Sequence, residues 1–317
     1  MSGPTTSSAR PEYEKRVNRV IDHIRRHLGE ELSLSGLAGV AAFSPFHFHR
    51  VFKATTGETL FGFIQRLRIE RAAVALTAHP DQSVLEVALD HGFSSAATFA
   101  RAFRARFGMS ATAWRDGGAA RWSARHRDER NLSKQVRKPG KASRARRPDT
   151  LRKRREEEAM SIQVRELPPY HVAYMRYVGP YGPHGIPELW VKFQKWMEAR
   201  GLASDTAIKL GIGYDDPHIT AAEKCRYDAC VVVPEDFPSD KWANVVDLPG
   251  GKVAVSQFMG GAHEISEAWN QVFSAWLPES GYQPDDRPCV EVYRGHAGVD
   301  GKPGVFRCEL CLPVRPL

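Results

Sequence analysis

Two arginines, Arg50 and Arg101, occupy the same place in two similar stretches of sequence. Each lies midway between two phenylalanines: Phe48 and Phe52 in the first stretch, Phe99 and Phe103 in the second. In an α-helix the phenylalanines of each pair share one face, and the arginine between them points away. A guanidinium on the outward face of a helix can make a bidentate contact with guanine in the major groove. The pattern therefore predicts two helices that each offer one arginine to DNA.

Neighbouring residues extend these two surfaces. The exposed arcs carry further side chains that can meet base edges or thymine methyls: Phe46, His49, Ala96, Ala97 and Ala100. Three basic residues are expected to contact phosphates instead: Lys53, Arg104 and Arg106. A single surface arginine can be no more than a solvated charge, but the equivalence of Arg50 and Arg101 favours a role in base recognition.

The two stretches belong to an internal repeat over residues 34–57 and 84–108. Ser44 to Gly57 matches Ser95 to Gly108 at a shift of 51 residues, and the preceding segment matches at a shift of 50. This spacing predicts a duplicated helix–turn–helix unit with one residue added in the second turn. Two such units on one chain can read adjacent stretches of major groove without a partner subunit. A dimer formed through the second half of the chain is the alternative to a monomer.

Local signals place the helices that would position these residues. A helix is expected over 12–28, followed by a short helix that Ser33 caps and that runs to Val40. Ser44 is expected to cap the next helix, with Pro45 in its first turn and Gly57 at its end. Apolar spacing predicts a long joining helix over 60–78 and then the second unit, with helices over 83–90 and 95–107. Trp114 lies near the end of this domain, which is expected to span 12–115.

Charge divides the chain at about residue 160. Residues 1–160 hold 30 Lys and Arg against 17 Asp and Glu, whereas residues 161–317 hold 15 against 20. A basic first half and a mildly acidic second half indicate that only the first half meets a polyanion. Residues 116–160 contain few large apolar side chains, which predicts a basic, flexible linker. It can add non-specific DNA affinity or serve only as a soluble tether.

The first half resembles the AraC/XylS family of bacterial transcription regulators. The motifs that carry this resemblance are Leu34-x-x-Leu37-Ala38, the Ser44–Gly57 segment, Arg68-Ile-Glu70-Arg71-Ala72, Gly92-Phe93-Ser94-Ser95 and Ala113-Trp114-Arg115. The resemblance implies that both recognition helices enter successive major-groove turns and that Arg50 and Arg101 contact bases. Ala96 and Ala97 stand where the family usually has polar residues, so readout by the second helix is expected to depend on Arg101 and phosphate contacts.

Residues 161–317 have the pattern of an α+β domain. Strands are expected at 162–164, 172–178, 227–233, 245–246, 253–258, 288–293 and 305–312, with helices at 187–199 and 262–276. The order is roughly β-β-α-β-β twice, which indicates a second duplication. The cleft between two such halves is a natural ligand site.

A carboxylate among aromatic residues marks a candidate ligand site in this domain. Glu291 and Tyr293 share one face of a strand, opposite Val290 and Val292. The aromatic residues expected to surround Glu291 are Tyr227, Trp276, Trp190 and Tyr181. An aromatic wall around a carboxylate suits a lipophilic cation, through cation–π attraction and charge pairing. The alternative is ordinary core packing with a solvated glutamate.

This half is similar to the GyrI-like effector-binding domain. The segments that support the resemblance include Val172–Tyr181, Arg226-Tyr227-Asp228, Gly250–Phe258 and Glu291-Val-Tyr293. The resemblance implies that Glu291 and surrounding aromatics hold hydrophobic, often cationic compounds. Two alternatives follow from the same resemblance: hydrolysis of reactive small molecules with the pocket glutamate as general base, or protein binding as in a gyrase inhibitor.

Neither a cofactor nor a metal site is expected. Cys308 and Cys311 would face opposite ways in a strand, and no second pair of ligands completes a zinc set. The odd number of cysteines, five, and the lack of a leader or a long apolar run favour a reduced, cytoplasmic, nucleoid-associated protein with no membrane partner.

The combined prediction is a multidomain protein that is not an enzyme. An all-α double helix–turn–helix DNA-binding domain is followed by an α+β pseudo-duplicated GyrI-like ligand-binding domain. The expected partners are double-stranded DNA, a small hydrophobic or cationic effector and RNA polymerase, and family analogy favours activation of transcription.

Overall fold

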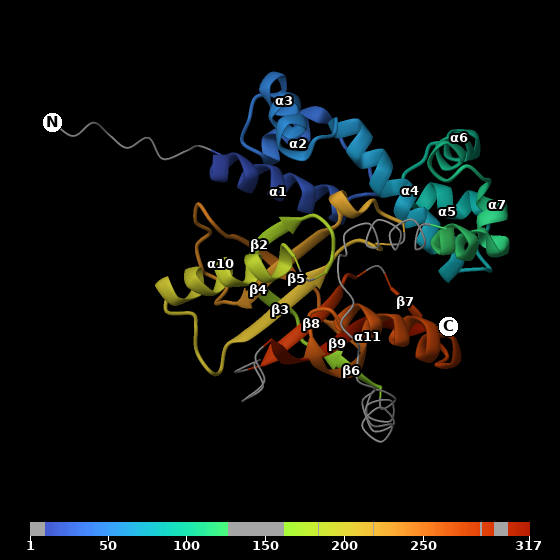
Figure 1. The fold of residues 1–317 in the computed structure, drawn as a ribbon. Helices are drawn as coiled ribbons and strands as arrows, with labels where there is room; N and C mark the ends of the chain where they lie inside the picture. Colours follow the sequence, from blue (N-terminus) through green and yellow to red (C-terminus); the bar gives the residue numbers. More distant parts are fainter. Residues whose placement is uncertain (1–9, 126–161, 183, 218, 286, 295–303) are drawn as a thin grey trace, which may run out of the picture. The chain divides into compact units, whose positions relative to one another are not determined.

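The computed structural model describes residues 10–125, 162–182, 184–217, 219–285, 287–294 and 304–317. The chain divides into two compact units, Met1–Arg137 and Lys138–Leu317. The described part of the first unit is helical, and the second unit is built on an antiparallel sheet (Figure 1). Within the described residues, no helix is long and apolar enough to cross a bilayer.

The helices of the first unit follow the predicted order. They are α1 (Arg10–Arg26), α2 (Leu34–Val40), α3 (Pro45–Thr56), α4 (Leu60–Ala78), α5 (Val84–Asp90), α6 (Ala96–Phe107) and α7 (Ala111–Ala113). Gly57 and Gly108 end α3 and α6 in the left-handed conformation, with φ of 75° and 71°. Ser33 caps α2 as expected, but the hydroxyl of Ser44 bonds to Nδ1 of His47 at 2.9 Å and leaves no side-chain cap on α3.

The duplication extends one helix further than the sequence repeat. At a shift of 52 residues, four buried positions of α1 fall on four buried positions of α4: Val17, Val20, Ile21 and Ile24 on Ile69, Ala72, Ala73 and Leu76. Ala42 and Gly92 hold equivalent left-handed positions in the two turns, with φ of 52° and 76°. The repeating unit is therefore three helices, α1–α3 and then α4–α6.

Helix α4 belongs to both copies. Its first half supplies Phe63, Ile64 and Leu67 to the core of α1–α3. Its second half contacts the second copy, and there the indole Nε1 of Trp114 donates to the carbonyl of Ala73 at 2.9 Å. In Figure 1, α4 runs from one helical cluster to the other.

The first unit continues beyond the predicted end at residue 115. A kink over Trp114–Gly118, where Gly117 has a φ of 88°, is followed by helix over 119–125. The Trp122 ring lies 5.2 Å from Phe107 and 6.1 Å from Trp114, centroid to centroid. The predicted flexible linker 116–160 therefore begins too early, because its one tryptophan packs on the aromatic core of the second repeat. Residues 126–160 of that prediction lie outside the described residues.

In the second unit two helices pack on an antiparallel sheet whose strand order differs from the order in the sequence. Its elements are β1 (Gln163–Leu167), β2 (Tyr170–Val178), α10 (Ile186–Ala199), β3 (Ile208–Gly213), β4 (Arg226–Val232), β5 (Asn244–Leu248), β6 (Gly251–Gly261), α11 (Ile265–Gln271), β7 (Tyr282–Pro284), β8 (Cys289–Arg294) and β9 (Val305–Pro316). Helix α10 packs on β2 and β4, and α11 packs on β6. The helix expected over 262–276 is shorter as an α-helix and ends in a π-helical turn over Val272–Trp276.

The strand order confirms the pseudo-duplication. The order is β1-β6-β9-β8-β3-β4-β2-β5, so the two halves meet where β3 pairs with β8. The first strand of each half pairs with a strand of the other half: β1 pairs with β6, and β5 pairs with β2. The sequence prediction missed β3 because glycines at positions 211 and 213 weaken its strand pattern.

Candidate functional site

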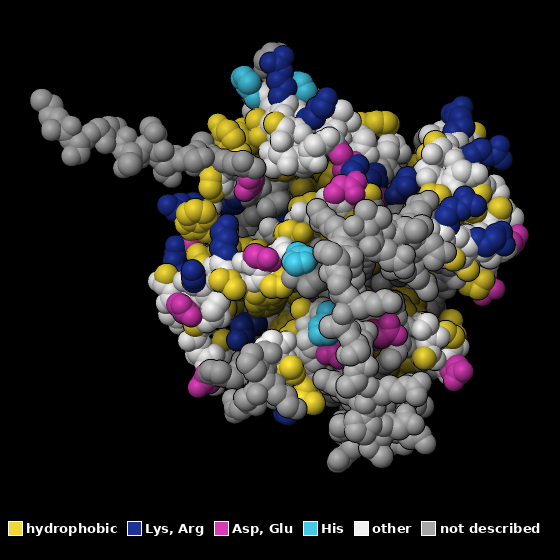
Figure 2. Space-filling view, in the orientation of Figure 1, with side chains coloured by type: hydrophobic (Ala, Val, Ile, Leu, Met, Phe, Trp, Pro, Cys, Tyr) yellow, Lys and Arg dark blue, Asp and Glu magenta, His cyan; other side chains and the backbone are white. Residues whose placement is uncertain are grey.

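The outer faces of α3 and α6 form the first candidate site. Phe48, Phe52, Phe99 and Phe103 are at most 1% exposed, and Arg50 and Arg101 are exposed between them, as predicted. Basic side chains gather on the surface over α3 and over α6 (Figure 2). The geometry gives each repeat an outward-facing arginine at the equivalent position, on a helix whose opposite face is fixed in the core.

The neighbouring predicted residues divide into two groups. Exposed on the same two helices are His49, Lys53, Ala97, Ala100 and Arg104. The side chain of Phe46 lies outside the described residues. Arg106, which was expected to contact phosphate, instead pairs with the buried carboxylate of Glu70 at 3.3 Å and lies over the ring of Trp122. The phosphate contact of Arg106 stays a prediction, and its guanidinium already has an ion-pair partner on α4.

The second candidate site surrounds Glu291 on β8. Oε2 of Glu291 accepts hydrogen bonds from the hydroxyls of Tyr227 at 2.7 Å and Tyr293 at 2.9 Å. Oε1 lies 3.3 Å from the indole Nε1 of Trp269, which donates to it. The indole of Trp190 donates to the Tyr227 hydroxyl at 3.2 Å, and its ring meets Tyr293 edge-on at 5.3 Å. Strands from both halves and both helices thus converge on one carboxylate.

Burial dominates the electrostatics of this cluster, which we call the Glu291 cluster (Trp190, Tyr227, Trp269, Glu291 and Tyr293). The Glu291 residue is only 8% exposed. Burial raises the pKa of Glu291, and the donated hydrogen bonds oppose that rise. Burial and the neighbouring carboxylate both raise the pKa of the Tyr227 hydroxyl. A bound cation would offset the desolvation cost of the carboxylate, so the cluster is suited to positive charge.

Two residues that shape the site are absent from the sequence prediction. One is Trp269, whose approach to Glu291 depends on how α11 packs. Gly211 on β3 is the backbone partner of Glu291 across the junction of the halves. A Cβ there would lie 2.0 Å from the Tyr227 hydroxyl oxygen, so the site needs glycine at this position. The two closely spaced glycines at positions 211 and 213, which obscure β3, were the available signal of a close approach.

Two of the predicted aromatics lie outside the hydrogen-bonded cluster. Trp276 stacks on Tyr282 at 6.3 Å and packs with Ala254, Leu312 and Val314. Tyr181 adjoins Tyr227, with ring centroids 6.4 Å apart, but its hydroxyl is engaged by the backbone of Tyr214, Asp215 and Arg226. The structure therefore brings Trp190, Tyr227 and Tyr293 to Glu291 and gives Tyr181 a peripheral place.

Cys308 and Cys311 fall into separate packing clusters. Cys308 packs with Phe258 and Tyr293, whereas Cys311 packs with Leu210 and Val292 on the other face of the sheet. Burial raises the pKa of the Cys289 and Cys311 thiols, each to about 12. Within the described residues no group of three His, Cys, Asp or Glu side chains is placed to hold a metal ion.

Comparison with known families agrees with the two-domain arrangement. Residues 37–117 match a helix-turn-helix domain, and residues 160–315 match the GyrI-like small molecule binding domain. The helix-turn-helix match covers α3 and α6, and the GyrI-like match contains every residue of the Glu291 cluster.

Several relatives cover one half of the chain each. An SPbeta prophage-derived candidate transcriptional regulator, YosT of Bacillus subtilis, is 37% identical over 156 residues, which are 49% of this chain and 100% of that protein. A DNA gyrase inhibitor of Escherichia fergusonii is 28% identical over 50% of this chain and 99% of its own length. The helix-turn-helix regulator YbfP of B. subtilis is 36% identical over 32% of this chain and 35% of its own length.

A solved AraC-type regulator from Chromobacterium violaceum matches 33% of this chain and 92% of its own, with 24% identity and a TM-score of 0.31.

Proposed function

The chain belongs to the AraC-type helix-turn-helix transcription regulators that carry a GyrI-like domain, and we propose that a lipophilic cation held at Glu291 controls its binding to DNA. The observation that supports the cation is the convergence of Tyr227, Tyr293 and Trp269 on one buried carboxylate. Ionised, this group would hold one negative charge inside an aromatic enclosure. Such an enclosure attracts a flat or bulky organic cation through its charge and through the ring faces.

For the DNA-binding half, we propose that Arg50 and Arg101 read one base step each in two successive major-groove segments. Their support is equivalence: both are exposed, and both lie between phenylalanines buried in the core of their own repeat. Lys53 and Arg104, also at equivalent positions, bind phosphates and fix the register. The regulator acts as an activator that recruits RNA polymerase, and it carries out no reaction on its effector.

A ligand titration tests the effector proposal. The full chain and its Glu291→Gln variant are titrated with tetraphenylphosphonium while tryptophan fluorescence is followed, since Trp190 and Trp269 both belong to the Glu291 cluster. Tetraphenylborate has the same shape and the opposite charge, and serves as the matched control. The proposal expects saturable binding of the cation that weakens about tenfold or more in the variant, and no binding of the anion. Equal binding of both ions, or of the cation to both proteins, would contradict it.

A protein-binding role is the second candidate, because the GyrI-like half aligns with almost the full length of a DNA gyrase inhibitor. If it holds, the full chain would bind purified DNA gyrase and reduce its supercoiling activity. Gyrase activity that is unaffected by an excess of the full chain would exclude this second role and leave the effector proposal standing.

A further inference from the structure

Arg68 on α4 is bonded directly to both helix–turn–helix repeats. Its Nε donates to the carbonyl of Leu28 at 2.9 Å, and one terminal nitrogen donates to the carbonyl of Glu30 at 2.8 Å. Both acceptors follow α1 in the first repeat. The other terminal nitrogen donates to the carbonyl of Gly92 at 2.8 Å, in the turn between α5 and α6 of the second repeat. One rigid guanidinium therefore ties three backbone groups from two reading units.

The equivalent arginine of the first repeat behaves differently. At the shift of 52 residues that relates α1 to α4, Arg16 corresponds to Arg68. Arg16 also donates to the carbonyl of its own turn, at Ala42, at 3.2 Å. Its Nε, however, bonds to Glu12 on its own helix at 2.9 Å. Both arginines thus donate to the turn of their own repeat. Arg68 in addition donates to two carbonyls of the other repeat.

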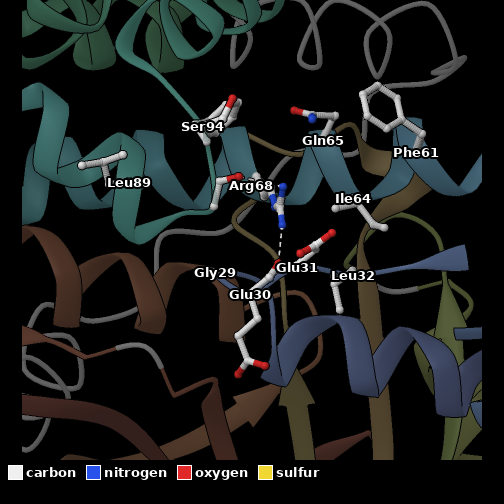
Figure 3. Close-up of a pocket in the computed structure, with 12 residues that line it drawn as sticks. Gly29, Glu30, Glu31, Leu32, Phe61, Ile64, Gln65, Arg68, Leu89 and Ser94 are labelled. Carbon is white, nitrogen blue, oxygen red and sulfur yellow. Dashed lines mark hydrogen bonds between the residues drawn. The ribbon is translucent and has the colours of Figure 1, made fainter. Parts of the chain in front are cut away.

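A groove separates the repeats around Arg68. It encloses about 400 Å³ and is lined by residues 29–32 of the first repeat, by Phe61, Ile64 and Gln65 of α4, and by Leu89, Gly92, Phe93 and Ser94 of the second. Figure 3 shows Arg68 between the 29–32 segment and the residues of the second repeat. At one edge of the groove the two repeats meet directly, since a Cβ on Gly29 would lie 2.7 Å from the carbonyl oxygen of Asp90. Beside this contact the Arg68 guanidinium joins the two sides through hydrogen bonds.

The backbone is adapted to this bridge. A Cβ on Gly92 would lie 2.7 Å from Cζ of Arg68, so glycine allows the guanidinium to approach the turn. The ion-paired series Glu58, Arg66, Glu70 and Arg106 attaches each repeat to α4. Arg68 differs because its acceptors are backbone carbonyls in the segment after α1 and in the turn between α5 and α6.

We propose that Arg68 is a positioning residue that sets the orientation of recognition helix α6 relative to α3, so that one chain can engage two major-groove segments at once. Binding of the second repeat is then an intramolecular event whose gain depends on the fixed geometry. Loss of the bridge would leave each repeat folded on its own core but would let the two helices vary in angle. Affinity for paired sites would fall, and affinity for one half-site would not.

The geometry is tested first without DNA. Spin labels are attached through unnatural amino acids at Ala54 on α3 and Ala105 on α6, which are exposed and equivalent in the repeat. The distance distribution is measured in the full chain and in three variants: Arg68→Gln, Arg68→Lys and Arg16→Gln. We expect a broadened distribution in Arg68→Gln, partial broadening in Arg68→Lys, and a narrow one in Arg16→Gln. An unchanged distribution in Arg68→Gln would overturn the proposal, whatever the outcome of any DNA experiment.

The DNA measurement rests on the proposed function and uses duplexes that the wild-type full chain selects from a random library. Arg68→Gln should lose about tenfold or more in affinity for the selected paired site and stay within about twofold for either half-site alone. Inserting one base pair between the half-sites should cost the wild type more than the variant. A uniform loss on paired and single sites would contradict a positioning role. Absence of any selected sequence would instead contradict base recognition by Arg50 and Arg101, while the distance distributions would still decide the role of Arg68.

Discussion

Gly211 and Glu291 face each other across the β3–β8 ladder, where the two halves of the sheet meet. The missing side chain of Gly211 leaves the space in which the Tyr227 hydroxyl reaches the Glu291 carboxylate. The centre of the pseudo-duplicated domain is therefore occupied by a polar contact that one methyl group would displace.

The first prediction concerns Gly211→Ala. The new Cβ would lie 2.0 Å from the Tyr227 hydroxyl oxygen and 2.5 Å from Oε2 of Glu291, so one of the two must move. We expect the free energy of unfolding of the second unit to fall by about 1–3 kcal/mol and cation binding to weaken. Chemical denaturation followed by tryptophan fluorescence measures the first effect.

Gly213→Ala is the matched control, two residues along the same strand. A Cβ there would lie 3.6 Å from the Tyr181 hydroxyl, an ordinary contact. Similar losses in stability and binding for both variants would show that β3 tolerates no alanine at all, and would refute the specific role given to Gly211.

The second prediction is a change in stability with pH. Because burial raises the folded-state pKa of Glu291, the native protein holds this proton more tightly than the unfolded chain. The corresponding stability is present below the usual glutamate pKa and is lost as pH rises through the raised value. Glu291→Gln should remove this part of the dependence and be at least as stable at neutral pH. An unchanged stability-against-pH curve in the variant would argue against a raised pKa.

The third prediction is that the affinity for a cation changes with pH in the opposite direction to the stability. A cation favours the ionised carboxylate, so its affinity should rise with pH through the raised pKa of Glu291 and then level off. A neutral aromatic ligand should show no such rise. Isothermal titration at several pH values would distinguish the two, and a flat profile for the cation would place it away from Glu291.

The fourth prediction separates base readers from phosphate binders. Arg50→Ala and Arg101→Ala should each cost about 1–3 kcal/mol on the preferred sequence and flatten preference over one half-site. Lys53→Ala and Arg104→Ala should weaken all sequences alike and reduce the salt slope by about one each. Binding to selected and scrambled duplexes at several salt concentrations measures both. An equal loss of affinity on all sequences from Arg50→Ala would contradict base recognition by Arg50.

The helical half could be predicted closely because its signals are local. Phenylalanine spacing, serine caps and terminal glycines specify each helix within a few residues of sequence. The bridge made by Arg68 could not be predicted, since its three acceptors lie 24 to 40 residues away in sequence and depend on how the repeats pack. The ion pair between Arg106 and Glu70 was missed for the same reason.

In the sheet domain, Glu291 and Tyr293 could be paired from strand alternation, which depends on neighbouring positions only. Trp276 was chosen for its residue type, and its place against Tyr282 is set by the π-helical turn that follows α11. Trp269, seven residues earlier, reaches Glu291 instead. Aromatic composition indicates a site, but the helix register decides which ring enters it.

DNA affinity of the full chain, measured with and without saturating tetraphenylphosphonium, tests the central claim most directly. For the wild type we predict that the cation changes affinity for the selected duplex by about fivefold or more, in either direction. For Glu291→Gln we predict no change at the same concentration. A cation that binds at Glu291 and leaves DNA affinity unaltered, or one that alters both proteins equally, would contradict control of DNA binding through this carboxylate.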